Sequence, residues 1–240
     1  MPRYFLEVAY KGTNYAGFQI QQNANTIQAE VEKALQVFYK QSFQLTGSSR
    51  TDAGVHAHQN FFHFDTELQI PNNTYHLNAI LPADIVIKNI KPVNDDAHCR
   101  FNATSREYHY HVSQQKNPFN NQYAYYFPYK INIDALNQAA QIILHNTDFT
   151  TFSKKNTQVH THNCIIFQSH WHLSNNELIY TVKANRFLRG MVRGLVATML
   201  QVGKGKISIQ QFQQIVNSKN PSQADFSAPA HGLFLIQVQY

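Results

Sequence analysis

The stretch Ser49–Ala57, SRTDAGVHA, gathers residue types that can do chemistry. Asp52 follows Arg50 by two residues and precedes Gly54 by two. A carboxylate can act as a nucleophile, a general base or a metal ligand. A nearby guanidinium favours its ionised form, and a glycine permits a tight turn or the close approach of a ligand. Asp52 is therefore a candidate nucleophile, although from these residues alone a structural turn with an Asx-type hydrogen bond is the favoured explanation.

A metal site is the second chemistry that this region suggests. Asp52, His56, His58, His63 and Asp65 lie close together in the sequence, and histidines spaced i, i+2 occur in zinc and iron sites. The same histidine spacing recurs at His109 and His111 and at His160 and His162, in segments that read as strand or loop, and no second set of paired carboxylates with ligand spacing appears. Thirteen histidines also produce such pairs by chance. We predict no metal, and keep as an alternative a metal-dependent hydrolase that uses His56, His58 and His63.

The positive charge of the chain is concentrated in its second half. The formal net charge is +6 and the pI is about 9.2. Residues 1–120 hold ten basic and ten acidic residues, whereas residues 121–240 hold ten basic and four acidic ones. Between Leu178 and Ala224 there are no acidic residues and seven basic ones: Lys183, Arg186, Arg189, Arg193, Lys204, Lys206 and Lys219. This region favours a polyanion such as nucleic acid as partner, and a solvated surface is the alternative.

Composition predicts a folded cytoplasmic protein. Hydrophobic residues make up 43% of the 240 residues, which supports a real core. Cys99 and Cys164 are far apart and form no C-x-x-C motif, which fits a reducing compartment. The segment MPRYFLEVAY lacks the apolar stretch of a signal peptide, and no apolar run reaches the roughly 18 residues of a membrane span.

Hydrophobic periodicity predicts strands and helices interspersed along the chain. The expected strands are 3–10, 43–46, 59–64, 85–90, 107–112, 165–173, 178–184 and 233–240. The expected helices are one capped by Asn25, then 74–81, 134–144, 186–201 and one capped by Ser208. This order favours an α+β fold with a mostly antiparallel sheet and helices on one side. We expect two half-domains, 1–100 and 101–240.

The segment RFLRGMVRGLVATML predicts an amphipathic helix. Its apolar residues recur at i, i+3, i+4 and i+7, and Arg186, Arg189 and Arg193 recur at spacings of three and four. An arginine row of this kind can contact phosphates or a carboxylate. An ordinary helix with a solvated charged face explains the pattern equally well.

Several motifs together resemble one known family. SRTDAGVHA resembles the catalytic signature of the tRNA pseudouridine synthase A family. Four further segments resemble family motifs in the same order: YKGTNYAGFQIQ at 10–21, REYHYHV at 106–112, ANRFLRGMVRGLV at 184–196 and APAHGLFLIQVQY at 228–240. The resemblance spans nearly the whole chain. Lys11 and Ala197 depart from the family, which commonly has an acid and a glycine there.

The resemblance implies an activity and a set of residue roles. The family isomerises uridine to pseudouridine in the anticodon stem-loop of tRNA, at positions 38, 39 and 40, without a cofactor. By this likeness, Asp52 is the nucleophile and Arg189 pairs with its carboxylate. Tyr108 packs against the target base and is a candidate for the C5 proton step, and Leu233 covers the other side of that base. Arg50 enters the RNA stem when the base leaves it.

The resemblance also implies the partners and the location of the site. The family acts as a homodimer, with one tRNA reaching across both subunits and an active-site cleft between the two half-domains of each. We expect Lys183, Arg186 and Arg193 to contact tRNA, with no membrane and no small-molecule cofactor. The order of bond breaking, and whether Asp52 attacks C6 or C1′, stay open. A non-catalytic RNA-binding module, or a related synthase acting on another RNA site, is an alternative.

Overall fold

In the computed structural model, which describes residues 1–154 and 159–240, the protein has an α+β fold with a mixed, mostly antiparallel sheet. The chain divides into two compact units. Unit 1 comprises Met1–Thr104 and Phe234–Tyr240, and unit 2 comprises Ser105–Leu233. The closing strand therefore belongs mainly with unit 1, whereas the sequence-based division grouped it with the second half.

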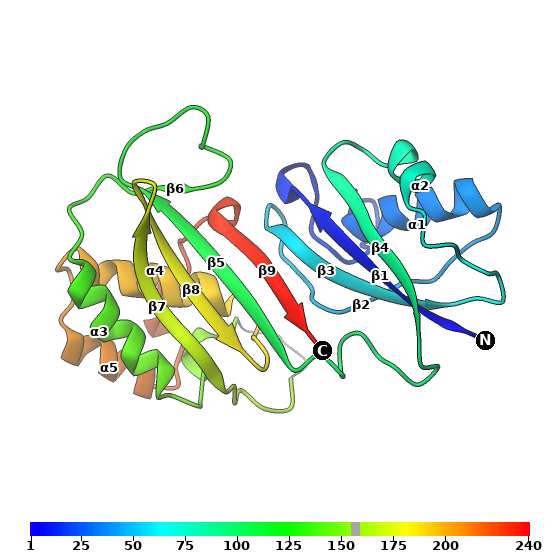
Figure 1. Ribbon diagram of the computed structural model, residues 1–240. Coiled ribbons are helices and arrows are strands. Elements are labelled where there is room, and N and C mark those ends of the chain that lie inside the picture. The colour runs from blue at the N-terminus through cyan, green and yellow to red at the C-terminus, as the bar shows by residue number, and fades with distance from the viewer. Residues whose placement is uncertain (155–158) are drawn as a thin grey trace. The chain divides into compact units, whose positions relative to one another are not determined.

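Unit 1 is a sheet in which β1 pairs antiparallel with both β3 and β4 (Figure 1). Its strands are β1 (Arg3–Tyr10), β2 (Thr46–Gly47), β3 (His56–Asp65), β4 (Ile85–Val93) and β9 (Leu233–Gln239). The helices are α1 (Ile27–Tyr39) and α2 (Tyr75–Ile80), with a short 3-10 turn η1 (Gly12–Asn14). β9 pairs parallel with the first residues of β3, so it lies beside the end of the loop that carries Asp52.

Apolar side chains on one face of β1 contribute to the core of unit 1. Leu6 and Val8 are fully buried, and the predicted stripe of α1 is buried at Ile27, Val31, Ala34 and Leu35. The predicted start of α1 was one residue early: Thr26 rather than Asn25 caps the helix, because the Thr26 hydroxyl accepts the N–H of Ala29 at 3.3 Å.

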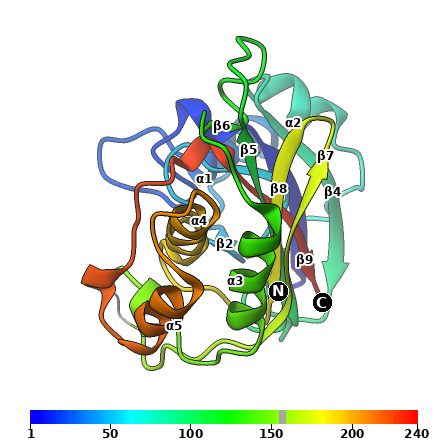
Figure 2. The ribbon, with the colours of Figure 1, turned by 90° about the vertical axis from the view of Figure 1, so that its left-hand side faces the viewer.

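Unit 2 is a sheet in which β8 pairs antiparallel with β5 and β7 while the short β6 pairs parallel with β5, and α3, α4 and α5 lie on one side of it (Figure 2). Its strands are β5 (Ser105–Ser113), β6 (Tyr125–Tyr126), β7 (Ile166–Ser174) and β8 (Glu177–Ala184). The helices are α3 (Ile133–Leu144), α4 (Met191–Gly203) and α5 (Ile209–Asn217). Short 3-10 turns are η2 (Thr150–Phe152), η3 (Pro221–Gln223) and η4 (Ala230–Gly232). The predicted hairpin of β7 and β8 is confirmed, with positive φ angles at its Asn175 and Asn176.

The helix α4 differs from the prediction in both length and character. It begins at Met191 rather than Arg186, because Gly190 has a left-handed φ of 74° at its N-cap. Apart from Arg193 and Gln201, every residue of α4 is buried. A helix that is apolar around its circumference belongs in a core, so α4 is a central core helix and not an amphipathic surface one.

Several predicted strands have different limits in the structure, and β4 and β5 extend beyond the expected 85–90 and 107–112. The expected strand at 43–46 is reduced to Thr46–Gly47, whereas β3 begins at His56, earlier than expected. The short β6 had no sequence signal. Among the described residues, no helix is long and apolar enough to cross a membrane.

Removing the cap of α5 tests the predicted start of that helix. The Ser208 hydroxyl accepts the N–H of Gln211 at 3.1 Å, and the Gln211 side chain accepts the N–H of Ser208 at 2.8 Å. We expect Ser208→Ala to lower the free energy of unfolding by about 1 kcal/mol. Urea denaturation measures this, with Ser42→Ala at an exposed position as control. Equal stability of the two variants would contradict the capping role.

Candidate active site

Asp52 lies on a tight turn between β2 and β3. The N–H of Val55 donates to the carbonyl of Asp52 at 3.2 Å, and Gly54 inside the turn has a φ of +80°. A residue with a side chain rarely adopts this backbone conformation, which accounts for the glycine two residues after the acid. The Asp52 side chain is half-buried, and Arg50 is exposed.

A second loop, residues 11–18, packs against this turn through glycines. The N–H of Phe18 donates to the carbonyl of Thr51 at 3.1 Å. A Cβ atom placed on Gly17 would lie 3.0 Å from the carbonyl oxygen of Thr51, and one on Gly12 would lie 2.0 Å from that of Val55. The two loops therefore approach so closely that Gly12 has no room for a side chain. The sequence predicted a loop containing several glycines, but it did not predict that this loop contacts the Asp52 turn.

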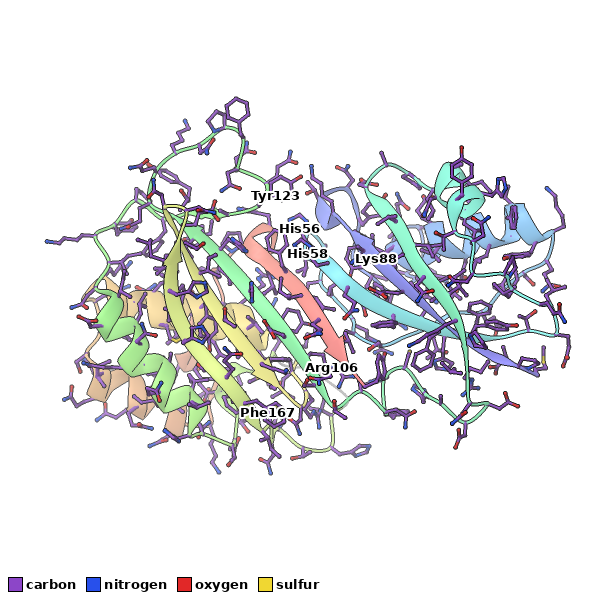
Figure 3. All side chains as sticks on the ribbon, viewed as in Figure 1. His56, His58, Lys88, Arg106, Tyr123 and Phe167 are labelled. Carbon is purple, nitrogen blue, oxygen red and sulfur yellow. The ribbon has the colours of Figure 1, made fainter. Side chains whose placement is uncertain are left out.

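The histidines of the alternative metal site are not assembled. His56 accepts the N–H of Gly12 at its Nδ1, 3.2 Å away, and its ring stacks on Phe234 with 4.6 Å between centroids. His58 stacks on the same phenylalanine at 5.7 Å, at the start of β3 (Figure 3). His63 lies near the other end of β3, opposite Phe5 and Thr46. Within the described ranges, the candidate metal group is a different one.

That group consists of His63, His98 and Cys99, whose ligand atoms lie within 4.8 Å of one another. Hydrogen bonds already occupy these atoms. Nδ1 of His98 accepts the N–H of Arg100 at 3.1 Å, and the Cys99 thiol donates to the carbonyl of Thr46 at 3.1 Å. Nδ1 of His63 faces the same sulfur at 3.1 Å. These side chains thus form a hydrogen-bonded thiol–imidazole contact, which differs from the set of His56, His58 and His63 considered from the sequence.

Unit 2 carries the other predicted site residues. Tyr108 is a buried residue of β5 whose ring meets Phe187 edge-on, with 5.0 Å between centroids. Leu233 is buried and is the first residue of β9, directly after η4. Arg189 is exposed, and its carbonyl accepts the N–H of Lys154 at 3.1 Å. Phe187, the aromatic neighbour of Tyr108, was missed by the sequence reasoning, although it lies within the basic motif.

The three arginines expected on one helix face, Arg186, Arg189 and Arg193, do not lie on one helix. Lys183 lies in β8, whereas Arg186 and Arg189 lie in the segment that precedes α4. Of the predicted arginine row, Arg193 is the helical member, and its Nε donates to the carbonyl of Ala228 at 2.6 Å. Arg193 therefore ties α4 to the segment before η4, a structural contact that the sequence pattern did not reveal.

The two departures from the family pattern have different surroundings. Lys11 starts the glycine-rich loop, and its N–H donates to the carbonyl of Asp84 at 2.9 Å. Ala197 is buried in the middle of α4. The alanine at position 197 therefore affects the packing of the core and not a substrate contact.

Comparison with known proteins identifies the family. A family model described as tRNA pseudouridine synthase matches residues 7–102 and 139–240. The chain is 42% identical over 243 residues to the tRNA pseudouridine synthase A of Parabacteroides distasonis, covering 100% of this chain and 96% of that protein. It is 43% identical to that of Azobacteroides pseudotrichonymphae, covering 100% and 97%, and 40% identical to that of Staphylococcus aureus strain MRSA252, covering 98% and 91%. The chain belongs to the tRNA pseudouridine synthase family.

The buried imidazole of His63 makes stability depend on pH. Burial, and then the charges of His98 and Arg3, lower the pKa of His63 to about 4. In the unfolded chain this pKa is about 6.5, so only the unfolded state binds the proton between pH 6.5 and 4. The His63 contribution to stability is therefore complete above pH 6.5. It is lost as the pH falls toward 4, by at most about 1.4 kcal/mol per pH unit.

We expect His63→Gln to flatten this part of the pH dependence of the unfolding free energy. Denaturation curves at several values between pH 4 and 7 measure it. His76→Gln, at an exposed position, is the matched control and should keep the slope of the original chain. An unchanged slope in His63→Gln would contradict a neutral buried imidazole.

Proposed function

We propose that this chain isomerises uridine to pseudouridine in tRNA, with Asp52 as the nucleophile. The observation that carries the proposal is the glycine-braced turn that presents Asp52, in a chain of this family. In the reaction, the N1–C1′ bond breaks and a C5–C1′ bond forms within the same nucleotide. N1 ends with a proton, and C5 loses one to a base. The balance requires no cofactor.

Each predicted residue has a role in this proposal. Asp52 attacks C6 of the base or C1′ of the ribose, and Arg189 pairs with its carboxylate. Tyr108 and Leu233 enclose the uracil, and Tyr108 is the candidate for the C5 proton step. These residues come from unit 1 and unit 2, so the proposal requires the two units to present them to the same nucleotide.

Reaching the base has an energetic cost that the protein must offset. A uracil in a stem has to be flipped out, at a few kcal/mol. Stacking on an aromatic ring such as Tyr108 returns about 1–3 kcal/mol. In this proposal Arg50, which is exposed, fills the vacated stack, and Lys183, Arg186 and Arg193 supply phosphate attraction. We assign the target uridines to the anticodon stem-loop, at positions 38, 39 and 40.

The assembly and location belong to the same proposal. A homodimer in which one tRNA reaches across both subunits is what the family resemblance implies. Double-stranded RNA is recognised mainly by shape, phosphates and 2′-hydroxyls, which suits a basic surface rather than base-reading side chains. The tRNA substrate suits the cytoplasm as the site of action.

Tritium release tests the reaction and its nucleophile. The purified protein is given tRNA with tritium at uracil C5, in the presence of EDTA. We expect release to water by the original chain and by the control Asp96→Asn, and none by Asp52→Asn, because the amide is not a nucleophile. Activity that required added metal would favour the hydrolase alternative. Tight tRNA binding without release would favour a non-catalytic RNA-binding module.

The salt dependence of tRNA binding tests whether Lys183 and Arg186 contact phosphates of the tRNA. We expect Lys183→Gln with Arg186→Gln to weaken binding and to lower the slope of log affinity against log salt by about 1–2, because each phosphate contact contributes roughly 0.7–0.9. Arg193 is left intact because it holds Ala228. Lys33→Gln with Lys91→Gln, exposed positions in unit 1, is the control of equal charge. Equal slopes for both double variants would overturn the placement.

A further inference from the structure

Three buried polar side chains lie beneath the Asp52 turn, and the proposed mechanism gives them no role. Tyr10 ends β1, Asn60 lies within β3, and Thr51 immediately precedes Asp52. Their exposed fractions are 5%, 0% and 8%. Polar groups that are buried this deeply are hydrogen-bonded within the protein. The partners of these three side chains therefore show which parts of the backbone they support.

The three side chains form one continuous chain of hydrogen bonds. Nδ2 of Asn60 donates to the Tyr10 hydroxyl at 3.2 Å and to the carbonyl of Ser49 at 2.8 Å. The Tyr10 hydroxyl in turn lies 2.7 Å from Oγ1 of Thr51. Oδ1 of Asn60 accepts the N–H of Phe61 at 2.9 Å, which fixes the orientation of the amide. The sheet is thereby connected to the backbone before Arg50 and to the side chain before Asp52.

A register irregularity lies in the sheet beside Tyr10 and Asn60. β1 and β3 pair regularly from Arg3 opposite Asp65 to Val8 opposite Asn60, but Tyr10 then lies opposite Ala57. β3 therefore carries one extra residue at this point. Irregularities of this kind re-aim side chains and are over-represented next to active sites.

The hydrogen-bond chain complements the backbone contacts of the turn. The carbonyl of Thr51 accepts the N–H of Phe18, and that of Asp52 accepts the N–H of Val55. The peptide groups on both sides of Asp52 are therefore held by hydrogen bonds. Such preorganisation matters because a misplacement of about 1 Å can lower a rate about 100-fold.

We infer that Tyr10, Asn60 and Thr51 act as positioning residues, which hold the Asp52 turn so that its carboxylate meets the target nucleotide in a reactive geometry. They act through Asp52 and do not touch the substrate. The inference rests on the proposed function, because it assigns Asp52 the role of nucleophile. A purely structural role would instead lower stability and leave the rate of the folded fraction unchanged.

Single-turnover tritium release, with enzyme in excess over tRNA, separates the two roles. We expect Tyr10→Phe and Thr51→Val each to lower the rate about 10- to 100-fold, with the Kd for tRNA changed less than about twofold. Thr51→Ser restores a hydroxyl and should recover most of the loss. Each substitution removes a hydroxyl from the same series of hydrogen bonds. The double variant Tyr10→Phe with Thr51→Val should therefore be no slower than the slower of the two single variants.

Tyr4→Phe is the matched control. Tyr4 lies on the same strand, is buried, and its hydroxyl donates to the carbonyl of Leu68 at 3.2 Å, so this variant also deletes a buried hydroxyl. It should keep the original rate while its thermal midpoint falls as much as that of Tyr10→Phe. If Tyr10→Phe fails to fold, the comparison of Thr51→Val with Thr51→Ser still distinguishes the positioning role from a purely structural one.

The outcomes separate this inference from the function on which it rests. If Asp52→Asn is inactive while Tyr10→Phe and Thr51→Val stay within threefold of the original rate, the positioning role is overturned and the proposed function stands. Rate losses equal to that of Tyr4→Phe would also overturn it. If Asp52→Asn retains the rate, the nucleophile assignment is overturned, and the positioning role is overturned with it.

Discussion

The close approach of two loops in unit 1 is the constraint on which the candidate site depends. Loop 11–18 reaches the Asp52 turn at backbone distance, and a single added methyl group on Gly12 would collide with the carbonyl of Val55. Backbone contact of this kind is stiffer than contact through side chains, because the atoms involved have few torsions left. Asp52 therefore lies on a turn that close backbone contacts and hydrogen bonds hold in place, and the chemistry that we propose depends on that support.

Periodic patterns made much of the fold predictable from the sequence. The strand of β1, the helix α3 and the capped start of α5 follow local rules and were found where expected. The helix α4 did not follow them, because its length is decided by the left-handed Gly190 and its environment by the helices and sheet around it. A run of apolar residues with three arginines is compatible with a surface helix. Its local pattern did not indicate that tertiary contacts bury nearly every residue of α4.

The candidate site shows the same division between local and distant information. The turn chemistry of Gly54 could be inferred from the motif, because its cause lies within four residues. The contact of Gly12 with Val55, the tie of Arg193 to Ala228 and the edge-on contact of Phe187 with Tyr108 join residues whose relation depends on the folded chain. The family resemblance supplied the candidate residues, whereas the structure supplied the reasons for their neighbours.

The return of β9 to unit 1 has a consequence for the order in which the protein is completed during synthesis. Unit 2 is one continuous segment, so all of its sequence is available once Leu233 has emerged from the ribosome. Unit 1 is made first for the most part, yet β3 lacks its parallel partner until Phe234–Tyr240 has followed. That pairing is at His56 and Ala57, directly after the Asp52 turn. The unit that carries Asp52 is therefore the later of the two to be finished, because the pairing beside the Asp52 turn forms only after Phe234–Tyr240 has been made.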